Sequence, residues 1–237
     1  MKTILKPNSV VLFQGDSITD CGRKRETPDL QPANAADQQA ADPLSNGSLG
    51  QGYPAKIAAI WETLCPGSGV KFINRGISGN RVADLLDRYE KDFKSLNPDL
   101  VSILIGINDT WRRYDRNDPT SADLFENRYR TLLTRLKQDF PNAIIVMIEP
   151  FLLGSIPERN LWREDLDPKI QAVRSLAKEL ADIYIPMDGI FVRYTVEGTK
   201  EADMAADGVH PTPLGHGIIA SEWLLGLKAP GKNPITR

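Results

Sequence analysis

The sequence predicts an α/β fold in which helices cover both faces of a parallel sheet. Short apolar runs alternate along the chain with longer segments whose apolar residues recur every three to four positions. This alternation is typical of βαβ units, whose parallel strands are buried on both faces. Most of the apolar runs end at glycine or polar residues, which predicts a site beyond the carboxyl ends of the strands.

Five strands and five helices follow from this pattern. The strands are expected at Val10–Gln14, Val70–Asn74, Asp99–Ile105, Ala143–Glu149 and Asp182–Met187. The helices are expected at Pro54–Leu64, Arg81–Phe93, Ser121–Phe140, Pro168–Ala181 and from Thr212 to about Leu225. Asn80 is the expected N-cap of the second helix. Thr212 followed by Pro213 gives the clearest helix start in the chain.

The length of 237 residues favours one domain, residues 1–237. Residues 24–52 are rich in small, polar and proline residues without any period, which predicts a long loop insertion. A surface loop is the simpler interpretation, and a lid or a subunit contact is the alternative. Residues 230–237 are expected to form a frayed tail.

Charge and cysteine content restrict the partners and the compartment. A net charge of −2 gives no basic excess, so neither nucleic acid nor a membrane surface is an expected partner. The N-terminal apolar run is broken by Lys6 and Pro7, short of a signal sequence, and the chain is predicted to be cytoplasmic, although removal of a signal peptide would leave the same sequence. Cys21 and Cys65 are expected to be free thiols.

Candidate catalytic residues follow the predicted strands. A serine hydroxyl becomes a nucleophile when an imidazole removes its proton and a carboxylate orients that imidazole. Only His210 and His216 are available, and His210 has Asp207 three residues before it, whereas His216 lies in the predicted last helix. Ser17 as nucleophile, His210 as base and Asp207 as its partner are therefore the predicted triad, and His216 is expected to be structural.

A second requirement is a set of donors for the oxyanion. Backbone N–H groups beside glycine and an asparagine amide are suitable donors. The N–H groups of Ser17 and Gly76 and the side chain of Asn108 are the predicted oxyanion hole. Each segment alone is also ordinary turn or cap chemistry, and the prediction depends on their joint occurrence at successive strand ends.

Four segments together resemble the blocks of the SGNH (GDSL) hydrolases. They are Gly15–Ser17, Gly76, Gly106–Asp109 and Asp207–His210, in the order of that family. The resemblance implies a flavodoxin-like, three-layer α/β/α fold, a Ser-His-Asp triad and the same oxyanion hole. The longer strings Asp16–Arg23, Gly76–Asn80 and Ile105–Asp115 are similar to the intracellular acetylxylan esterases within the family, and the segment 24–52 looks longer than the corresponding loop there.

The substrate is expected to be an acylated carbohydrate, with xylo-oligosaccharides as one example. Trp111, Arg112 and Tyr114 follow Asn108, and an aromatic face beside a guanidinium suits a sugar ring, although Trp111 is equally a candidate packing residue. Asp16 is added to these as a candidate substrate-binding residue. The sequence predicts a serine esterase that removes acetyl or other short acyl groups, with a homo-oligomer as a possible assembly.

Three alternatives remain open at this point. A short-chain lysophospholipase or thioesterase would use the same chemistry, and a non-catalytic carbohydrate-binding module would keep only the fold. A metal-dependent hydrolase is the third, because Asp109, Asp115 and Asp118 cluster in the sequence. A solvated charged loop is the preferred interpretation of that cluster, and neither a metal nor another cofactor is predicted.

Overall fold

A five-stranded parallel sheet forms the centre of the molecule. The computed structural model describes residues 5–25 and 47–228. The strands are β1 (Val10–Gly15), β2 (Lys71–Asn74), β3 (Leu100–Leu104), β4 (Ile144–Ile148) and β5 (Ile183–Ile185). Their spatial order is β2-β1-β3-β4-β5, which is the flavodoxin-like order, and all neighbours are parallel. The five predicted strands and the predicted fold class are confirmed.

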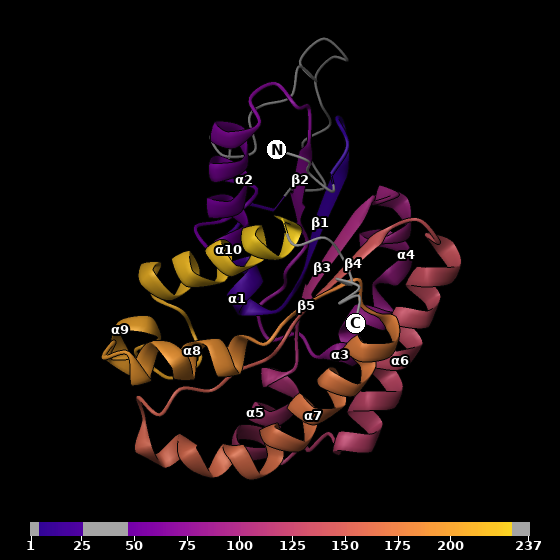
Figure 1. The fold of residues 1–237 in the computed structure, drawn as a ribbon. Helices are drawn as coiled ribbons and strands as arrows, with labels where there is room; N and C mark the ends of the chain where they lie inside the picture. Colours follow the sequence, from indigo (N-terminus) through magenta and orange to yellow (C-terminus); the bar gives the residue numbers. More distant parts are fainter. Residues whose placement is uncertain (1–4, 26–46, 229–237) are drawn as a thin grey trace, which may run out of the picture.

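Helices form a layer on each face of this sheet (Figure 1). One layer contains α2 (Tyr53–Leu64) and α10 (Pro213–Lys228), and the other contains α3 (Val82–Asp87), α4 (Tyr89–Asp92), α6 (Ala122–Asp139) and α7 (Arg163–Leu180). The remaining elements are α1 (Ser17–Asp20), α5 (Ile107–Arg116), α8 (Met187–Val196), α9 (Glu201–Met204) and the 3-10 helices η1 (Lys94–Leu96) and η2 (Pro157–Trp162).

Each face of the sheet has its own apolar core. The side chains of β3 alternate between them: Leu100 and Leu104 pack with α2 and α10, whereas Val101 and Ile103 pack with α6 and α7. Burial on both faces explains why the central strands β1, β3 and β4 are predominantly apolar in the sequence. On the α10 side, the indole N–H of Trp223 donates to the hydroxyl of Ser102 at 3.0 Å, which satisfies both buried polar groups.

Several helix boundaries differ from the prediction. The second predicted helix is divided into α3, α4 and η1, and its N-cap is Arg81, whose N–H donates to the carboxylate of Asp84. Asn80 was the expected cap, but its side chain accepts from Arg88 Nε instead. α7 begins at Arg163 rather than Pro168, because η2 leads directly into it and supplies the preceding turn.

Other predictions fall partly outside the described residues. Most of the predicted 24–52 loop and the predicted 230–237 tail lie there. The described flanks of that loop are joined by hydrogen bonds from Lys24 N to Gly47 O and from Gln51 N to Cys21 O, both of 2.9 Å. Cys21 and Cys65 are free thiols. Among the described helices, none is both long and apolar enough to cross a membrane.

Candidate active site

Ser17 lies at the carboxyl end of the central strand β1. The strand ends at Gly15, and Asp16 caps the short helix α1, its Oδ1 accepting from Ile18 N at 3.0 Å. Ser17 is the first residue of α1 and remains partly exposed. The strand-to-helix turn therefore presents the hydroxyl at the edge of the sheet where ligands bind in this fold.

A hydrogen-bonded chain joins Ser17 to the two other predicted triad residues. Ser17 Oγ lies 2.9 Å from His210 Nε2, and His210 Nδ1 lies 2.8 Å from Asp207 Oδ2. Because the carboxylate accepts a hydrogen bond from Nδ1–H, the neutral imidazole has its lone pair at Nε2, facing the hydroxyl. This is the arrangement that a serine nucleophile requires.

The loop that carries Asp207 and His210 is internally bonded. Asp207 Oδ1 accepts from Val209 N at 2.9 Å and from His210 N at 2.7 Å. Gly208 O accepts from Leu153 N at 2.9 Å, which attaches the loop to the segment after β4. The following helix begins as predicted, with Thr212 Oγ1 accepting from Gly215 N at 3.3 Å.

The interactions between Asp207 and His210 favour the anionic form of Asp207. Burial alone would raise the pKa of Asp207, but hydrogen bonds from the His210 ring and from two backbone N–H groups hold it well below its usual range. The hydrogen bond to Asp207 raises the pKa of His210 above its ordinary value, against the opposing effect of burial. The anionic Asp207 therefore favours the charged, imidazolium form of His210 over the neutral ring.

Gly76 is not available as an oxyanion donor, which corrects the prediction. Its N–H donates to Asn74 Oδ1 at 2.8 Å, so this group is already used. A Cβ at Gly76 would lie 2.4 Å from Asp20 N, and the absence of a side chain here serves this close packing. Arg23 Nε donates to Gly76 O at 2.8 Å and holds the same segment in place.

The next glycine in this segment has the free donor that Gly76 lacks. Within residues 5–25 and 47–228, the N–H groups of Ser17 and Gly79 donate to no protein acceptor. Gly79 has φ +83°, a conformation that favours glycine, in a turn closed by a bond from Asn80 N to Ile77 O. Sequence reasoning missed Gly79 because both glycines follow β2 and only the side chain of Asn74 distinguishes them.

Asn108 lies at the start of α5, beside that turn. Its Nδ2 donates to Asn80 O at 3.2 Å, and its Oδ1 accepts from Arg112 Nη2 at 2.9 Å. These two bonds fix which end of the amide carries the N–H groups and leave one of them for another acceptor. Arg112 also pairs with Asp115, so the structure uses this predicted substrate-binding guanidinium to orient Asn108.

We expect Asn108→Ala to reduce kcat for ester hydrolysis by roughly 100- to 1,000-fold with little change in KM, the effect of removing one oxyanion donor. Steady-state kinetics on a soluble acetyl ester measures it. Asn127→Ala is the matched control, because Asn127 is an exposed asparagine on α6, outside the segments that carry Ser17, Asp207 and His210. A defect confined to KM would assign Asn108 to ground-state binding.

An aromatic wall, which we define as Trp111, Tyr114 and Trp162, stands beside His210. Trp162 lies 5.1 Å from Trp111 and is stacked on Tyr114 at 5.3 Å, both measured between ring centroids. Trp111 in turn lies 5.8 Å from the His210 ring. Trp162 comes from η2, and it was missed because nothing in its sequence surroundings indicates a site.

The remaining predicted residues have structural contacts. Asp16 is only 1% exposed, so the structure does not support contact of its carboxylate with substrate. Burial raises the pKa of Asp16 to about 7, although the Ile18 N–H and the charge of His210 oppose this. His216 is buried, accepts from Tyr53 N at Nδ1 and lies 3.4 Å from Cys21 Sγ. We therefore interpret Asp16 and His216 as structural residues.

The carboxylates of the predicted acidic cluster have separate partners. Asp109 is buried and accepts from Val82 N, Asp115 pairs with Arg112, and Asp118 pairs with Arg81. These residues belong to α5 and its C-terminal flank, where the sequence predicted a solvated loop. Within the described part of the chain, no three His, Cys, Asp or Glu side chains converge as metal ligands do.

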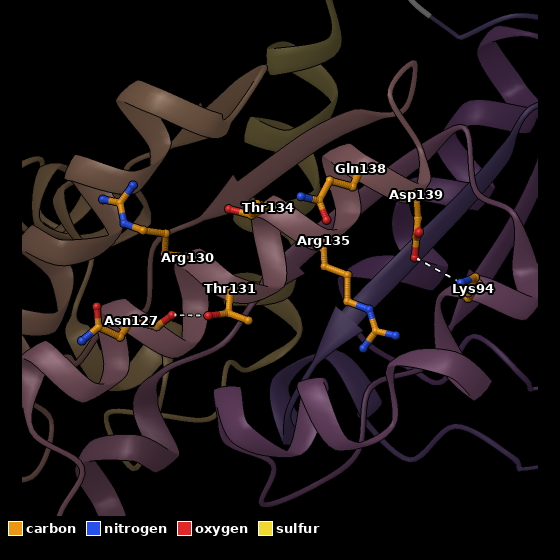
Figure 2. A pocket seen from close by; sticks show the side chains of 8 residues that line it. All are labelled: Lys94, Asn127, Arg130, Thr131, Thr134, Arg135, Gln138 and Asp139. Atoms are coloured by element: carbon orange, nitrogen blue, oxygen red, sulfur yellow. Dashed lines mark hydrogen bonds and ion pairs between the residues drawn. The ribbon is translucent and has the colours of Figure 1, made fainter.

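A separate groove lies on the outer face of α6 (Figure 2). Its lining includes Lys94, Arg130 and Arg135, and none of the predicted catalytic residues. Each of these cations is paired with a carboxylate: Lys94 with Asp139 at 3.7 Å, Arg130 with Glu179, and Arg135 with Glu90. The groove therefore offers no unpaired charge for an anionic ligand.

The comparison with known proteins identifies the family. The model of the GDSL-like lipase/acylhydrolase family matches residues 13–218, a range that contains all three members of the hydrogen-bonded chain. The chain belongs to this family. Family membership makes this GDSL hydrolase a carboxylic ester hydrolase, as predicted.

Characterised relatives are esterases. The GDSL hydrolase is 34% identical to an acetylxylan esterase from Geobacillus stearothermophilus over 90% of its own length and 91% of that protein. It is 27% identical to an arylesterase from Vibrio mimicus over 79% of its length and 88% of that protein. Both relatives match most of this chain.

Solved structures show the same fold. A GDSL-like protein from Parabacteroides merdae superposes with a TM-score of 0.82 at 34% identity, over 96% of this chain and 99% of that one. The Geobacillus acetylxylan esterase superposes with a TM-score of 0.78 at 31% identity, over 97% and 98%. Three further structures of that esterase are described as catalytic mutants, in which a serine, an aspartate and a histidine are replaced by alanine.

Proposed function

We propose that this GDSL hydrolase is a serine esterase that removes acetyl or other short acyl groups from carbohydrates such as xylo-oligosaccharides. The chain of hydrogen bonds from Ser17 through His210 to Asp207 carries the proposal. The same three residue types are replaced in the catalytic mutants of the Geobacillus acetylxylan esterase, where the aspartate and histidine are also three positions apart.

In the proposed reaction, Ser17 Oγ attacks the acyl carbonyl as His210 Nε2 takes its proton. The oxyanion accepts hydrogen bonds from Ser17 N, Gly79 N and Asn108 Nδ2, with Gly79 taking the place that the sequence analysis gave to Gly76. His210 then returns the proton to the departing sugar oxygen, which leaves an acyl-serine. Water, deprotonated by His210, attacks this ester and releases the acid, and the proton returns to Ser17.

The aromatic wall supports a sugar as the alcohol part of the ester. Flat aromatic faces pack against the apolar faces of sugar rings. Tyr114 is 39% exposed, and its hydroxyl donates to Leu161 O, which fixes its ring against Trp162. We propose Trp111 and Tyr114 as the sugar-binding surface, with the buried ring of Trp162 packed behind them.

The test is the rate on esters of graded acyl length together with acetylated xylo-oligosaccharides. We expect the highest kcat/KM for acetyl esters, and Tyr114→Ala to raise KM for the oligosaccharide about tenfold while leaving an aryl acetate nearly unchanged. Leu161→Ala, which removes the neighbouring exposed side chain, is the control. A preference for a lysophospholipid or a thioester would overturn the proposed substrate, and failure of Ser17 to react with a fluorophosphonate would favour the binding module.

We also propose that the enzyme acts in the cytoplasm as a homo-oligomer. The free thiols of Cys21 and Cys65 are consistent with a reducing compartment. Exposed apolar side chains on α2 and α10, among them Ile60 and Leu214, line one groove and support contact with a second copy. Light scattering of the purified protein measures the assembly, and a monomer at micromolar concentration would contradict it.

A further inference from the structure

Arg159, which the sequence did not single out, joins the aromatic wall to Asp207. It lies on η2, and its Nη1 donates to the backbone oxygen of Asp207 at 2.6 Å. The same Nη1 lies 3.3 Å from Asp207 Oδ2. The guanidinium therefore contacts both the main chain and the side chain of the residue that orients His210.

The carboxylate oxygen in this contact is the one that binds the catalytic imidazole. Asp207 Oδ2 accepts from His210 Nδ1 at 2.8 Å, so imidazole and guanidinium share one acceptor atom. A carboxylate oxygen can accept two hydrogen bonds, and a cation on the same oxygen reduces its attraction for a second positive charge. Arg159 thus opposes part of the stabilisation that Asp207 gives to a charged His210.

Two aromatic rings hold the guanidinium in this place. The Cζ atom of Arg159 lies 4.7 Å from the ring centroid of Trp111 and 5.1 Å from that of Trp162. Only 23% of its side chain is exposed. A planar, delocalised cation can stack on aromatic faces and donate from its edge at the same time, which an ammonium group cannot do with equal geometry.

We propose that Arg159 is a positioning residue with two functions. Its positive charge holds Asp207 against His210, and the stacking of its planar guanidinium on Trp111 and Trp162 holds the aromatic wall in place. It touches neither the reacting atoms nor, in this proposal, the acyl group. The charge part rests on the triad and the second part rests on the proposed sugar surface. The two parts are separable, because a lysine at this position would keep the charge and lose the plane.

The other charged groups around His210 define the direction in which its pKa should shift when Arg159 is replaced. Asp207 and Asp16 favour the imidazolium, whereas Arg159 disfavours it, and His216 is buried and its pKa is lowered to about 4 by burial, so it stays neutral. Because burial raises the pKa of Asp16 to about 7, removing the cation leaves chiefly the Asp207 carboxylate unopposed. The pKa of His210 should then rise, and activity that requires neutral His210 should be lost at a higher pH.

The experiment measures kcat/KM against pH for Arg159→Met and Arg159→Lys with an aryl acetate, and KM with an acetylated xylo-oligosaccharide. We call the acidic side of the profile, over which activity is lost as the pH falls, the acid limb. For Arg159→Met we expect kcat to fall about tenfold and the midpoint of the acid limb to shift to higher pH by about half a unit. For Arg159→Lys we expect the limb to stay at the wild-type pH and KM for the oligosaccharide to rise several-fold. Arg113→Met removes an equal charge from α5, away from Asp207, and should change neither quantity.

Two results would overturn the proposal. One is an acid limb of Arg159→Met that coincides with the wild type while its melting temperature is unchanged. The other, which also applies if the methionine variant does not fold, is a limb of Arg159→Lys that moves despite the retained charge. If the wild type cleaves the aryl acetate but no sugar ester, the proposed substrate fails, while the position of the limb still tests Arg159.

Discussion

Ser17→Ala and His210→Ala should each reduce kcat for ester hydrolysis by about a million-fold, and the double variant should be little worse than either single variant. The physical reason is that the hydroxyl and the imidazole act as one unit: the 2.9 Å contact between Ser17 Oγ and His210 Nε2 delivers the nucleophile, and loss of either partner ends that route. Single-turnover kinetics on an activated acetyl ester measures the residual rate.

His216→Gln provides the control for this prediction. His216 is buried and accepts from Tyr53 N at 3.2 Å, so its replacement should lower the melting temperature while most of kcat remains. If His216→Gln were as inactive as His210→Ala with an intact circular dichroism spectrum, the base proposed here would be wrong. The comparison is sharp because these are the two histidines of the chain.

Asp207→Asn should reduce kcat/KM by about 10,000-fold, although the side chain keeps its shape. An amide in this place can present an N–H to Nδ1, which favours the tautomer with the proton on Nε2 and so removes the acceptor for the Ser17 proton. It also removes the charge that stabilises the imidazolium. Because Arg159 and Val209 would still contact the residue, the loop should stay folded, and the loss would be electrostatic in origin.

The same carboxylate determines the pH dependence of the wild type. The hydrogen bond to Asp207 raises the pKa of His210, and catalysis needs the neutral ring. Activity should therefore be full at neutral to slightly alkaline pH and should be lost as the pH falls through a value near or above the free-histidine pKa of about 6.5. A profile of kcat/KM for an acetyl ester measures this, and an optimum in acid would indicate a different base.

The sequence was sufficient to predict the sheet because its strands are buried on both faces. A continuous apolar run such as Ile144–Ile148 in β4 leaves little choice of structure. α5 could not be predicted in the same way, because four of its ten residues are buried and they all lie in its first half, while four of the other six are charged, as in a loop. Its helical state depends on packing against η2 and α7.

The site shows a similar division. Ser17, Asp207 and His210 were predictable because chemistry allows few substitutes for them and the chain offers only two histidines. The choice between Gly76 and Gly79 depended on where Asn74 Oδ1 points, which no spacing reveals. Arg159 and Trp162 come from a 3-10 helix without periodicity, and their proximity to Asp207 follows from the tertiary fold alone.

The internally bonded loop that carries Asp207 and His210 has a consequence for the thermal inactivation of the enzyme. Acid and base are three residues apart and are held by bonds within one loop, whereas the nucleophile is 193 residues away in sequence and reaches the base across a single 2.9 Å contact. We expect mild heating, or a distant mutation that loosens the packing of this loop against the sheet, to separate Ser17 from His210 before it separates His210 from Asp207. Activity would then be lost before the protein unfolds. An inactivated sample would contain molecules in which Asp207 still contacts His210 but Ser17 no longer does.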